Sequence, residues 1–233
     1  AAIGPRTRAV IVNSPNNPTG AIYAAGELAE LAALLAKRSQ ENGRPIFLVS
    51  DEPYRFLTYD GAVVPPVLPL YPYTVVAGSF SKNLGLAGER VGYLAAAPTM
   101  PDLPSFMAGV TMTNRILGFV NAPAIGQKIL LAALGSGVDV SVYARRRDAM
   151  ARVLTAAGIE FSLPKGAFYF FPKAPGGRDD KAFVDLLLAE NVLGVPGSGF
   201  GYPGYFRLAF CTDQNTIERS APAFARAAAA ARA

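Results

Sequence analysis

The sequence predicts a three-layer α/β fold built on a mainly parallel sheet, followed by a smaller C-terminal α+β domain. In the first half, short and wholly apolar runs alternate with a segment of helical periodicity, which is typical of parallel strands buried on both faces. Polar residues follow the ends of these runs, and open α/β sheets bind their ligands at that edge. The last third contains short strands and helices in a less regular order, which indicates a separate small unit.

The first half contains the strands expected for the parallel sheet. The apolar runs place them at residues 9–12, 46–49, 74–77 and 91–97. Residues 27–38 carry leucines at a spacing of three and four, which predicts an amphipathic helix that stops at Gly43. Residues 98–114 are expected to form a long irregular connector.

The second half begins with two predicted helices, over residues 121–134 and 138–157. We place the domain boundary between them, which gives part of a large domain at residues 1–137 and a small domain at residues 138–233. In the small domain we expect a helix at 180–190, strands at 167–172, 192–201 and 205–210, and a C-terminal helix at 212–232 that is capped by Thr212 or Asp213.

Composition excludes several kinds of site. The 233 residues include no histidine and one cysteine, Cys211, so Ser-His-Asp and Cys-His catalytic pairs within this chain are excluded and no metal site is expected. The net charge of +5 comes from scattered basic residues, and we interpret the run Arg145–Arg147 as the solvated face of a helix and not as a nucleic-acid patch. No apolar run reaches the roughly 18 residues of a membrane span, no leader opens the chain, and a lone cysteine fits a reducing compartment. We therefore expect a soluble, cytoplasmic protein that binds neither nucleic acid nor a membrane.

The segment from Thr74 to Tyr93 holds the strongest candidate for chemistry. A short apolar run ends in small and hydroxyl residues, Lys82 stands just past its end, and Arg90 follows among three glycines. A lysine at a strand end can act as an amine nucleophile, and an arginine among glycines can bind a phosphate. On this spacing alone, a surface lysine and a surface arginine on a glycine-rich hairpin are an equally good interpretation.

The same residues resemble a known segment. Ser79-Phe-Ser-Lys82, followed by Gly-Leu-Ala-Gly-Glu-Arg90-Val-Gly-Tyr93, is similar to the cofactor lysine segment of the class I/II pyridoxal-phosphate aminotransferases. The resemblance implies that Lys82 carries pyridoxal 5'-phosphate as a Schiff base and that Ser79 and Arg90 bind its phosphate. It also implies that the predicted parallel sheet is part of the large domain of the fold type I transferases.

Two further segments resemble this family. Asp51-Glu-Pro-Tyr54 follows a predicted strand, where an anion must be paired or its pKa rises. Without the resemblance, the alternative interpretation is that Asp51 is a helix cap or a surface acid and that Tyr54 is an ordinary aromatic residue at a strand end. The similarity to the family's Asp-x-x-Tyr segment implies that Asp51 pairs with the pyridine nitrogen of the cofactor and that Tyr54 donates a hydrogen bond to its phenolic oxygen.

The segment Asn16-Asn17-Pro-Thr-Gly20 is similar to the family's Asn-Pro-Thr-Gly loop. This resemblance implies that Asn17 binds the same phenolic oxygen and contacts the substrate. The alternative interpretation is that these residues only form turns.

Arg207 lies in a predicted strand whose sides alternate. Phe206, Leu208 and Phe210 fall on one face, which leaves Arg207 on the other face beside a tyrosine and an alanine. Such an arginine can reach a planar carboxylate, and an edge-strand arginine that faces water is an even alternative on pattern alone. The segment resembles the C-terminal arginine strand of the same family, which implies that Arg207 binds the α-carboxylate of the substrate.

Together, these resemblances imply an enzyme that transfers an amino group between an amino acid and a 2-oxo acid, with Lys82 moving the proton. Only small molecules are expected as substrates, the complete protein is expected to be a homodimer, and the choice of amino donor stays open. The resemblance covers nearly all 233 residues but only the later part of a usual family member. We therefore expect a fragment of a longer polypeptide, whose partial sheet exposes unpaired edges and apolar faces.

Three alternatives remain. A pyridoxal-phosphate-dependent β-lyase, such as a carbon–sulfur lyase, shares Lys82, Asp51, Tyr54 and Arg207. The second alternative is the aminotransferase-like sensor domain of a transcriptional regulator, in which a DNA-binding segment has to lie upstream of this chain. A catalytically inactive structural module is disfavoured by the intact set of polar positions.

Overall fold

The computed structural model describes residues 2–233, which divide into two compact units. Unit 1 comprises the chain up to Pro15 together with Tyr23–Phe56 and Val63–Val138, and unit 2 comprises Asn16–Ile22, Leu57–Ala62 and Asp139–Ala233. Each unit contains a sheet and a buried core of its own. No helix within residues 2–233 combines the length and the apolar character needed to cross a lipid bilayer.

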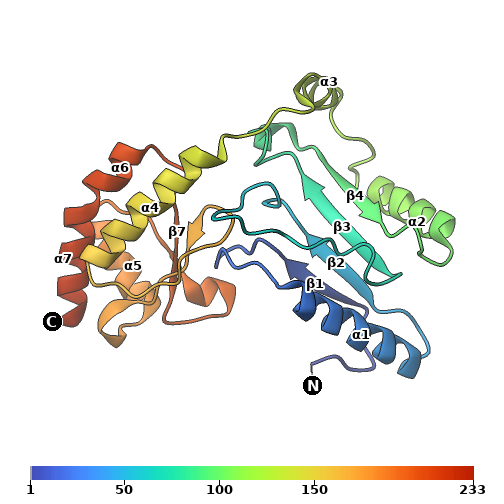
Figure 1. The fold of residues 1–233 in the computed structure, drawn as a ribbon, viewed down its shortest axis with the longest axis horizontal. Coiled ribbons are helices and arrows are strands. Elements are labelled where there is room, and N and C mark those ends of the chain that lie inside the picture. Colours follow the sequence, from blue (N-terminus) through green and yellow to red (C-terminus); the bar gives the residue numbers. More distant parts are fainter. Residues whose placement is uncertain (1) are drawn as a thin grey trace. The chain divides into compact units, whose positions relative to one another are not determined.

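The sheet of unit 1 has the strand order β1 (Ala9–Asn13), β2 (Phe47–Asp51), β3 (Thr74–Ser79) and β4 (Gly92–Ala96) (Figure 1). The first two pairs are parallel, and β4 pairs with β3 in the antiparallel sense. The four strands predicted from apolar runs are thereby confirmed, and so is the α/β class with a mainly parallel sheet. Because β1, β2 and β3 run in the same direction, the residues at their carboxyl ends meet at one edge of the sheet.

Helix α1 (Ala25–Glu41) covers one face of this sheet. The amide of Ala24 donates to the carboxylate of Glu27 at 2.7 Å, which satisfies a free amide at the start of the helix. Its buried positions are Leu28, Ala32 and Leu35, at the spacing expected from the sequence. They pack into the same hydrophobic clusters as the strand residues Val12, Leu48 and Val76 and as Ile46, which directly precedes β2.

The segment after β4 differs from the prediction. Residues 98–114 were expected to be irregular, but helix α2 (Leu103–Ile116) forms there and α3 (Ala124–Ala133) follows. Pro104 lies in the first turn of α2, where a proline is compatible with a helix. No residue of α2 is buried in the described chain, although Leu103, Phe106, Met107 and Val110 recur at the spacing of three and four that is typical of an amphipathic helix.

Unit 1 exposes large apolar side chains, as expected for a partial sheet. Ile11 on the edge strand β1 is 72% exposed, and Leu94 on the opposite edge strand is also exposed. The exposed set continues over α2, α3 and their connection, with Met112, Ile116, Phe119, Ile125 and Leu131. A folded monomer rarely leaves so many large apolar side chains uncovered on one part of its surface.

Unit 2 contains a small antiparallel sheet with the strand order β5 (Tyr169–Phe170), β7 (Phe206–Ala209) and β6 (Val195–Pro196). Its helices are α4 (Val140–Ala156), α5 (Asp180–Ala189), α6 (Gln214–Arg219) and α7 (Ala221–Arg232). Short 3-10 turns of unit 2 span Pro175–Gly177 and Gly197–Phe200. A third 3-10 turn, Ala87–Glu89, belongs to unit 1. The alternation predicted for β7 is confirmed, because Phe206, Leu208 and Phe210 are all buried.

The C-terminal helix is interrupted, which the sequence reading missed. Asp213, one of the two residues expected to cap this helix, accepts hydrogen bonds from the amides of Asn215 and Thr216 at the start of α6. The helix ends at Arg219 and α7 starts at Ala221. Pro222 explains the break, because proline has no amide hydrogen and its ring clashes with the carbonyl one turn earlier.

Two short segments from the first half of the chain belong to unit 2. The amides of Lys165 and Gly166 both donate to the carbonyl of Gly20, and the amide of Tyr59 donates to the carbonyl of Lys165. The loop before β5 therefore pairs with Asn16–Ile22 on one side and with Leu57–Ala62 on the other. Chain order alone gives no sign of this arrangement.

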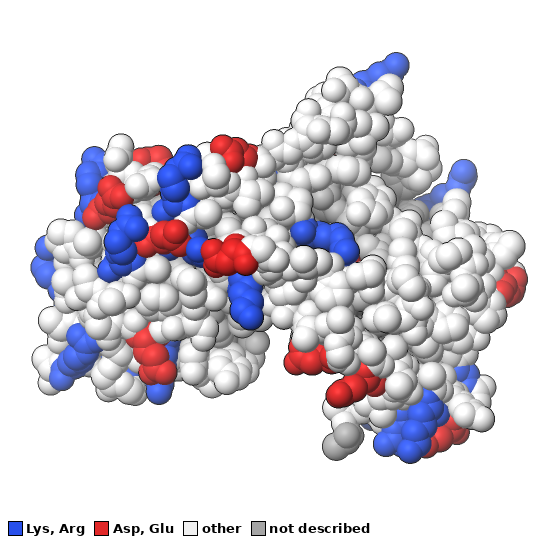
Figure 2. Space-filling model, viewed as in Figure 1, with Lys and Arg blue, Asp and Glu red and all other residues white. Residues whose placement is uncertain are grey.

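Arg147 corrects the interpretation of the basic run. It is only 4% exposed, its guanidinium donates to both carboxylate oxygens of Asp60, and it lies 4.7 Å from the centre of the Tyr59 ring. The run is therefore not a uniformly solvated face, because Arg147 anchors the Leu57–Ala62 segment. On the face drawn in Figure 2, basic and acidic side chains are interspersed, without a large patch of one sign.

Gly20 is expected to be sensitive to substitution. Its φ is +68°, and a Cβ atom there would lie 2.3 Å from Cβ of Pro164. We expect Gly20→Ala to lower the free energy of unfolding by about 2–5 kcal/mol, as a left-handed alanine and an overpacked contact both destabilise. Urea denaturation measures the loss. Gly61→Ala is the matched control, because its φ is +72° but no atom lies within 4 Å, so only about 1–2 kcal/mol should be lost. Equal losses in the two variants would contradict the contact with Pro164.

Candidate functional site

Three of the predicted site residues of unit 1 lie at the carboxyl edge of its sheet: Asp51, Ser79 and Lys82. Asn13 ends β1, Asp51 ends β2 and Ser79 ends β3. The parallel register pairs Asn13 with Asp51, and Asp51 with Ala77 on the next strand. Lys82 follows in the turn that continues β3, so the amine comes from the same edge as the carboxylate.

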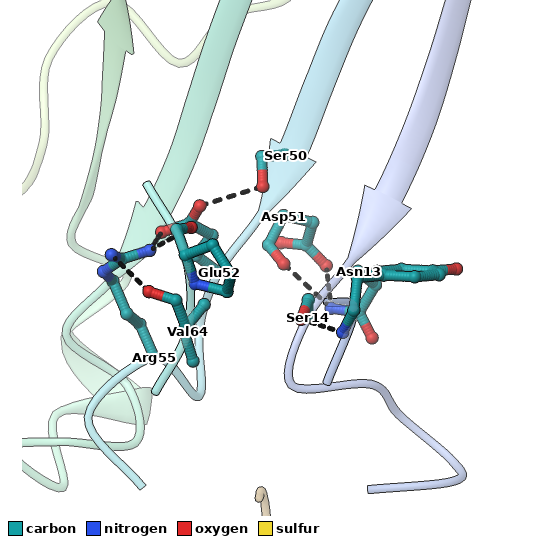
Figure 3. A network of polar contacts seen from close by, with 9 residues as sticks. Asn13, Ser14, Ser50, Asp51, Glu52, Arg55 and Val64 are labelled. Carbon is teal, nitrogen blue, oxygen red and sulfur yellow. Dashed lines mark hydrogen bonds and ion pairs between the residues drawn. The ribbon is translucent and has the colours of Figure 1, made fainter. Parts of the chain in front are cut away.

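Asp51 is held by Asn13. The side-chain amide of Asn13 donates to the Asp51 carboxylate and to its carbonyl oxygen, both at 3.0 Å (Figure 3). The pKa of Asp51 is raised, first because burial disfavours the charged form and also because Glu52 is negatively charged, while the hydrogen bond from Asn13 opposes the rise. A cation beside this carboxylate offsets the unfavourable desolvation.

A second carboxylate, Glu52, faces away from Asp51. The hydroxyl of Ser50 and the guanidinium of Arg55 both donate to Glu52 at 2.9 Å, and Arg55 also donates to the carbonyl of Val64 (Figure 3). Glu52 is buried, so this pairing prevents an uncompensated charge in the core. The network also fixes the turn that leads from Asp51 to Tyr54, which is buried as well.

The segment around Lys82 offers hydroxyls and a guanidinium. The hydroxyl of Ser79 donates to that of Ser81 at 2.9 Å and accepts the amide of Ser81 at 3.1 Å. Lys82 is half-buried. Arg90 is exposed in a left-handed conformation with φ of 55°, and its guanidinium donates to the carbonyl of Ala87. Gly78 before this segment leaves room for Tyr93, because a Cβ there would lie 2.1 Å from the ring.

The two predicted substrate residues lie together in unit 2. The guanidinium of Arg207 donates to the side-chain oxygen of Asn17 at 3.0 Å. It also stacks over two rings, at 4.8 Å from the centre of Tyr169 and 4.9 Å from that of Phe200. These contacts hold the half-buried guanidinium in one orientation, which is the requirement for bidentate binding of a carboxylate.

Three residues of these sites were missed from the sequence. Asn13 stands at the end of a strand, and the parallel register that places it opposite Asp51 appears only when the strands are paired. Tyr169 falls in the predicted strand at 167–172, and its place beside Arg207 appears only when β5 pairs Tyr169 with Ala209, which lies two residues from Arg207 on the same face. Phe200 belongs to a 3-10 turn and had no pattern to mark it.

The residues of unit 1 fit pyridoxal phosphate. A half-buried carboxylate that lacks full solvation suits a protonated pyridine nitrogen, and the hydroxyl of Ser79 with the guanidinium of Arg90 suits a phosphate. An amine on the adjacent turn suits the aldehyde of the cofactor. The donor set thus offers a partner of opposite charge to the pyridine nitrogen and to the phosphate, and a nucleophile to the aldehyde.

The raised pKa of Asp51 predicts a pH dependence for the cofactor-free protein. The folded state holds the proton more tightly than the unfolded chain, so stability falls as pH rises from the ordinary carboxyl range through the raised pKa. The Asp51→Asn variant lacks this loss of stability. Its melting temperature should therefore rise relative to that of the unsubstituted protein as pH increases from the ordinary carboxyl range through the raised pKa. At lower pH the difference between the two melting temperatures should be constant. Thermal unfolding at a series of pH values measures the difference.

Asp139 provides a control of opposite sign. Its pKa is lowered, chiefly by its hydrogen bond with Ser141, so its stabilisation is present at neutral pH and is lost as pH falls through the lowered value. Asp139→Asn should therefore lose stability relative to the unsubstituted protein as pH rises. A difference between Asp51→Asn and the unsubstituted protein that does not change with pH would contradict the assignment.

Comparison with known proteins identifies the family. The sequence model for aminotransferase class I and II matches residues 1–224. The chain belongs to the class I and II aminotransferases. Enzymes of this family depend on pyridoxal phosphate, which agrees with the donor set described above.

Individual relatives cover nearly the whole chain. An aspartate/prephenate aminotransferase of Thermus thermophilus is 33% identical over 97% of the chain, and an aromatic-amino-acid aminotransferase of Thermococcus litoralis is 31% identical over 94%. The crystal structure of an aminotransferase from Eubacterium rectale matches all of the chain with 41% identity and a TM-score of 0.94, which confirms the fold type I architecture. The chain spans 56% to 58% of the length of these three proteins.

Proposed function

We propose that the protein to which this chain belongs is a pyridoxal-phosphate-dependent aminotransferase, which moves an amino group between an amino acid and a 2-oxo acid. The observation that carries the proposal is the desolvated carboxylate of Asp51 at the end of β2, beside the strand that leads into Lys82. Such a carboxylate is suited to a cationic partner. Family membership and the partial match to aminotransferases of known name support the same reaction.

The residues of unit 1 are assigned to the cofactor. Asp51 keeps the pyridine nitrogen protonated, and Asn13 orients its carboxylate. Ser79 and Arg90 bind the phosphate, and Tyr54 donates its hydroxyl hydrogen to the phenolic oxygen. When bound, the cofactor supplies an electron sink for the carbon that loses its proton.

Lys82, Asn17 and Arg207 are assigned to the reacting groups. Arg207 binds the α-carboxylate of the amino acid through its two terminal nitrogens, in the orientation set by Asn17 and the two flanking rings. Asn17 also binds the phenolic oxygen of the cofactor. The Lys82 amine would hold the cofactor covalently, and its free form would move the proton at the α-carbon of the substrate.

The proposal includes the state and location of the protein. We expect a homodimer in the cytoplasm, with amino acids and 2-oxo acids as its small-molecule substrates. The described chain leaves a large apolar surface at α2, α3 and the sheet edges. This surface supports the proposal that further polypeptide, from the complete chain or from a second subunit, covers it.

The proposal is tested with the complete polypeptide. After incubation with pyridoxal phosphate and dialysis, borohydride reduction should leave a pyridoxyl group on the peptide that contains Lys82, as read by mass spectrometry. The loaded protein should then convert a 2-oxo acid into its amino acid at the expense of an amino donor. Release of ammonia and pyruvate without any need for a 2-oxo acid would instead assign a β-lyase, and the absence of a modified Lys82 would overturn the cofactor site itself.

A further inference from the structure

A pocket of about 520 Å³ opens in unit 2, a volume typical of small-molecule sites. Its nine lining residues are all uncharged, and four of them are aromatic: Phe171, Phe200, Tyr202 and Tyr205. The remainder are small or amide residues of the Asn17 loop, together with Ser162.

The pocket is continuous with the Arg207 site. Asn17 lines the pocket and accepts the hydrogen bond from Arg207. Phe200 also lines it, and its ring lies under the Arg207 guanidinium. A carboxylate bound to Arg207 therefore places the rest of its molecule at the mouth of this pocket.

The four aromatic rings form one cluster. Phe171 stacks on Tyr205 with ring centres 5.5 Å apart, and it contacts Phe200 and Tyr202 at about 6 Å. Tyr202 meets Tyr205 edge to face at 4.9 Å. Rings arranged in this way present both faces and edges to the pocket, which favours apolar and aromatic groups packed against them.

The uncharged lining disfavours a second carboxylate on the substrate. Among the described residues that line the pocket, none is a lysine or arginine, so a side-chain carboxylate that entered would lose solvation without a paired charge. An apolar side chain loses nothing of this kind and gains burial.

On the basis of the proposed function, we propose that this pocket receives the side chain of the amino donor and selects aromatic or large apolar amino acids over dicarboxylic ones. Phe171, Phe200, Tyr202 and Tyr205 are the residues that determine this preference. The carboxylate at Arg207 gives affinity common to all amino acids, and the aromatic cluster discriminates between them.

The inference is tested by donor binding to the complete, cofactor-loaded protein. Phenylalanine, leucine, aspartate or glutamate is mixed alone with this protein, and the initial rate of change of the visible cofactor band is recorded over a range of donor concentrations. The donor concentration that gives half of the maximal rate is the apparent dissociation constant of that donor, because the amino group passes to the cofactor in this half of the reaction without a second substrate. Phenylalanine and leucine should bind about 10- to 100-fold more tightly than the two dicarboxylic acids.

Tyr202→Arg tests the role of the pocket directly. Tyr202 is 57% exposed, so a guanidinium can be accommodated there and would pair with a side-chain carboxylate. The ratio of phenylalanine to aspartate affinity should fall about tenfold or more in this variant. Leu188→Arg, at an apolar residue of unit 2 that is 54% exposed and lies on α5, is the matched control and should leave the ratio unchanged.

The possible outcomes separate this inference from the proposed function. Tighter binding of aspartate than of phenylalanine would overturn the inference and leave amino transfer intact. An unchanged ratio in Tyr202→Arg would overturn the role of the pocket. Binding in the expected order without transfer to a 2-oxo acid would support the inference and overturn the proposed reaction, whereas no binding of any donor would overturn both.

Discussion

Lys82→Ala is expected to lower the rate of amino transfer by at least about 10⁴-fold, because the Lys82 amine is assigned both covalent attachment and proton transfer, and losing such a group removes factors of this size. The variant should also lose pyridoxal phosphate on gel filtration after borohydride treatment. Steady-state rates and cofactor content, measured on the same preparation of the complete protein, check both expectations.

The control for this variant is Lys37→Ala. Lys37 is an exposed lysine on α1, in a long and solvated ion pair with Glu41 at 4.0 Å, and its loss should affect neither the rate nor cofactor content. Covalent retention of pyridoxal phosphate by Lys82→Ala would contradict the assignment of Lys82. A normal rate with reduced retention would separate attachment from proton transfer and leave the second role to another group.

Arg207→Leu is expected to reduce kcat/KM for amino acids by about 10²- to 10⁴-fold. The estimate follows from the loss of two charge-assisted hydrogen bonds to the α-carboxylate, each of about 1.5–3 kcal/mol. Arg207→Lys keeps the charge but loses the planar fork, so its reduction should be about 10- to 100-fold. Both losses should fall mainly on KM, and initial rates over a range of donor concentrations measure them.

Arg226→Leu is the matched control for the Arg207 series. Arg226 also belongs to unit 2, but it forms a surface ion pair with Glu190 at 2.6 Å and has no assigned role in binding or catalysis. Its substitution should leave KM unchanged. If Arg207→Leu behaved like Arg226→Leu, Arg207 would have to be reassigned as a residue that only packs between Tyr169 and Phe200.

The strands of unit 1 were predictable because they are apolar, although β4 has no buried residue and Ile11 of β1 is exposed in the described chain. Each is a short apolar run, and runs of this length favour strands over helices, so β1 to β4 appear within a few residues of their predicted positions. Helix α1 was predictable for the same reason, since its leucines form a stripe that must be covered. Helix α2 carries a similar spacing at Leu103, Phe106, Met107 and Val110, but three prolines within residues 98–104 also mark this part of the chain as a turn region.

The cofactor was also predictable from the sequence. Lys82, Asp51 and Arg207 are polar residues next to apolar strands, where a charge is unfavourable unless a partner or a ligand compensates for it. Their resemblance to a known segment then indicated the cofactor, and the match to the family over residues 1–224 agrees.

Contacts between residues distant in the chain were decided only by the tertiary structure. Strand pairing places Asn13 against Asp51, and the β5–β7 ladder places Tyr169 beside Arg207. The packing of Leu57–Ala62 into unit 2 buries Arg147 through Asp60, although the sequence around Arg147 is typical of a solvated helix. Local patterns record which face of an element must be buried, and they carry no information about which distant element supplies the covering groups. The residues that could be predicted are therefore those whose role follows from their own strand, whereas their supporting partners and the aromatic pocket depend on how the strands and loops assemble.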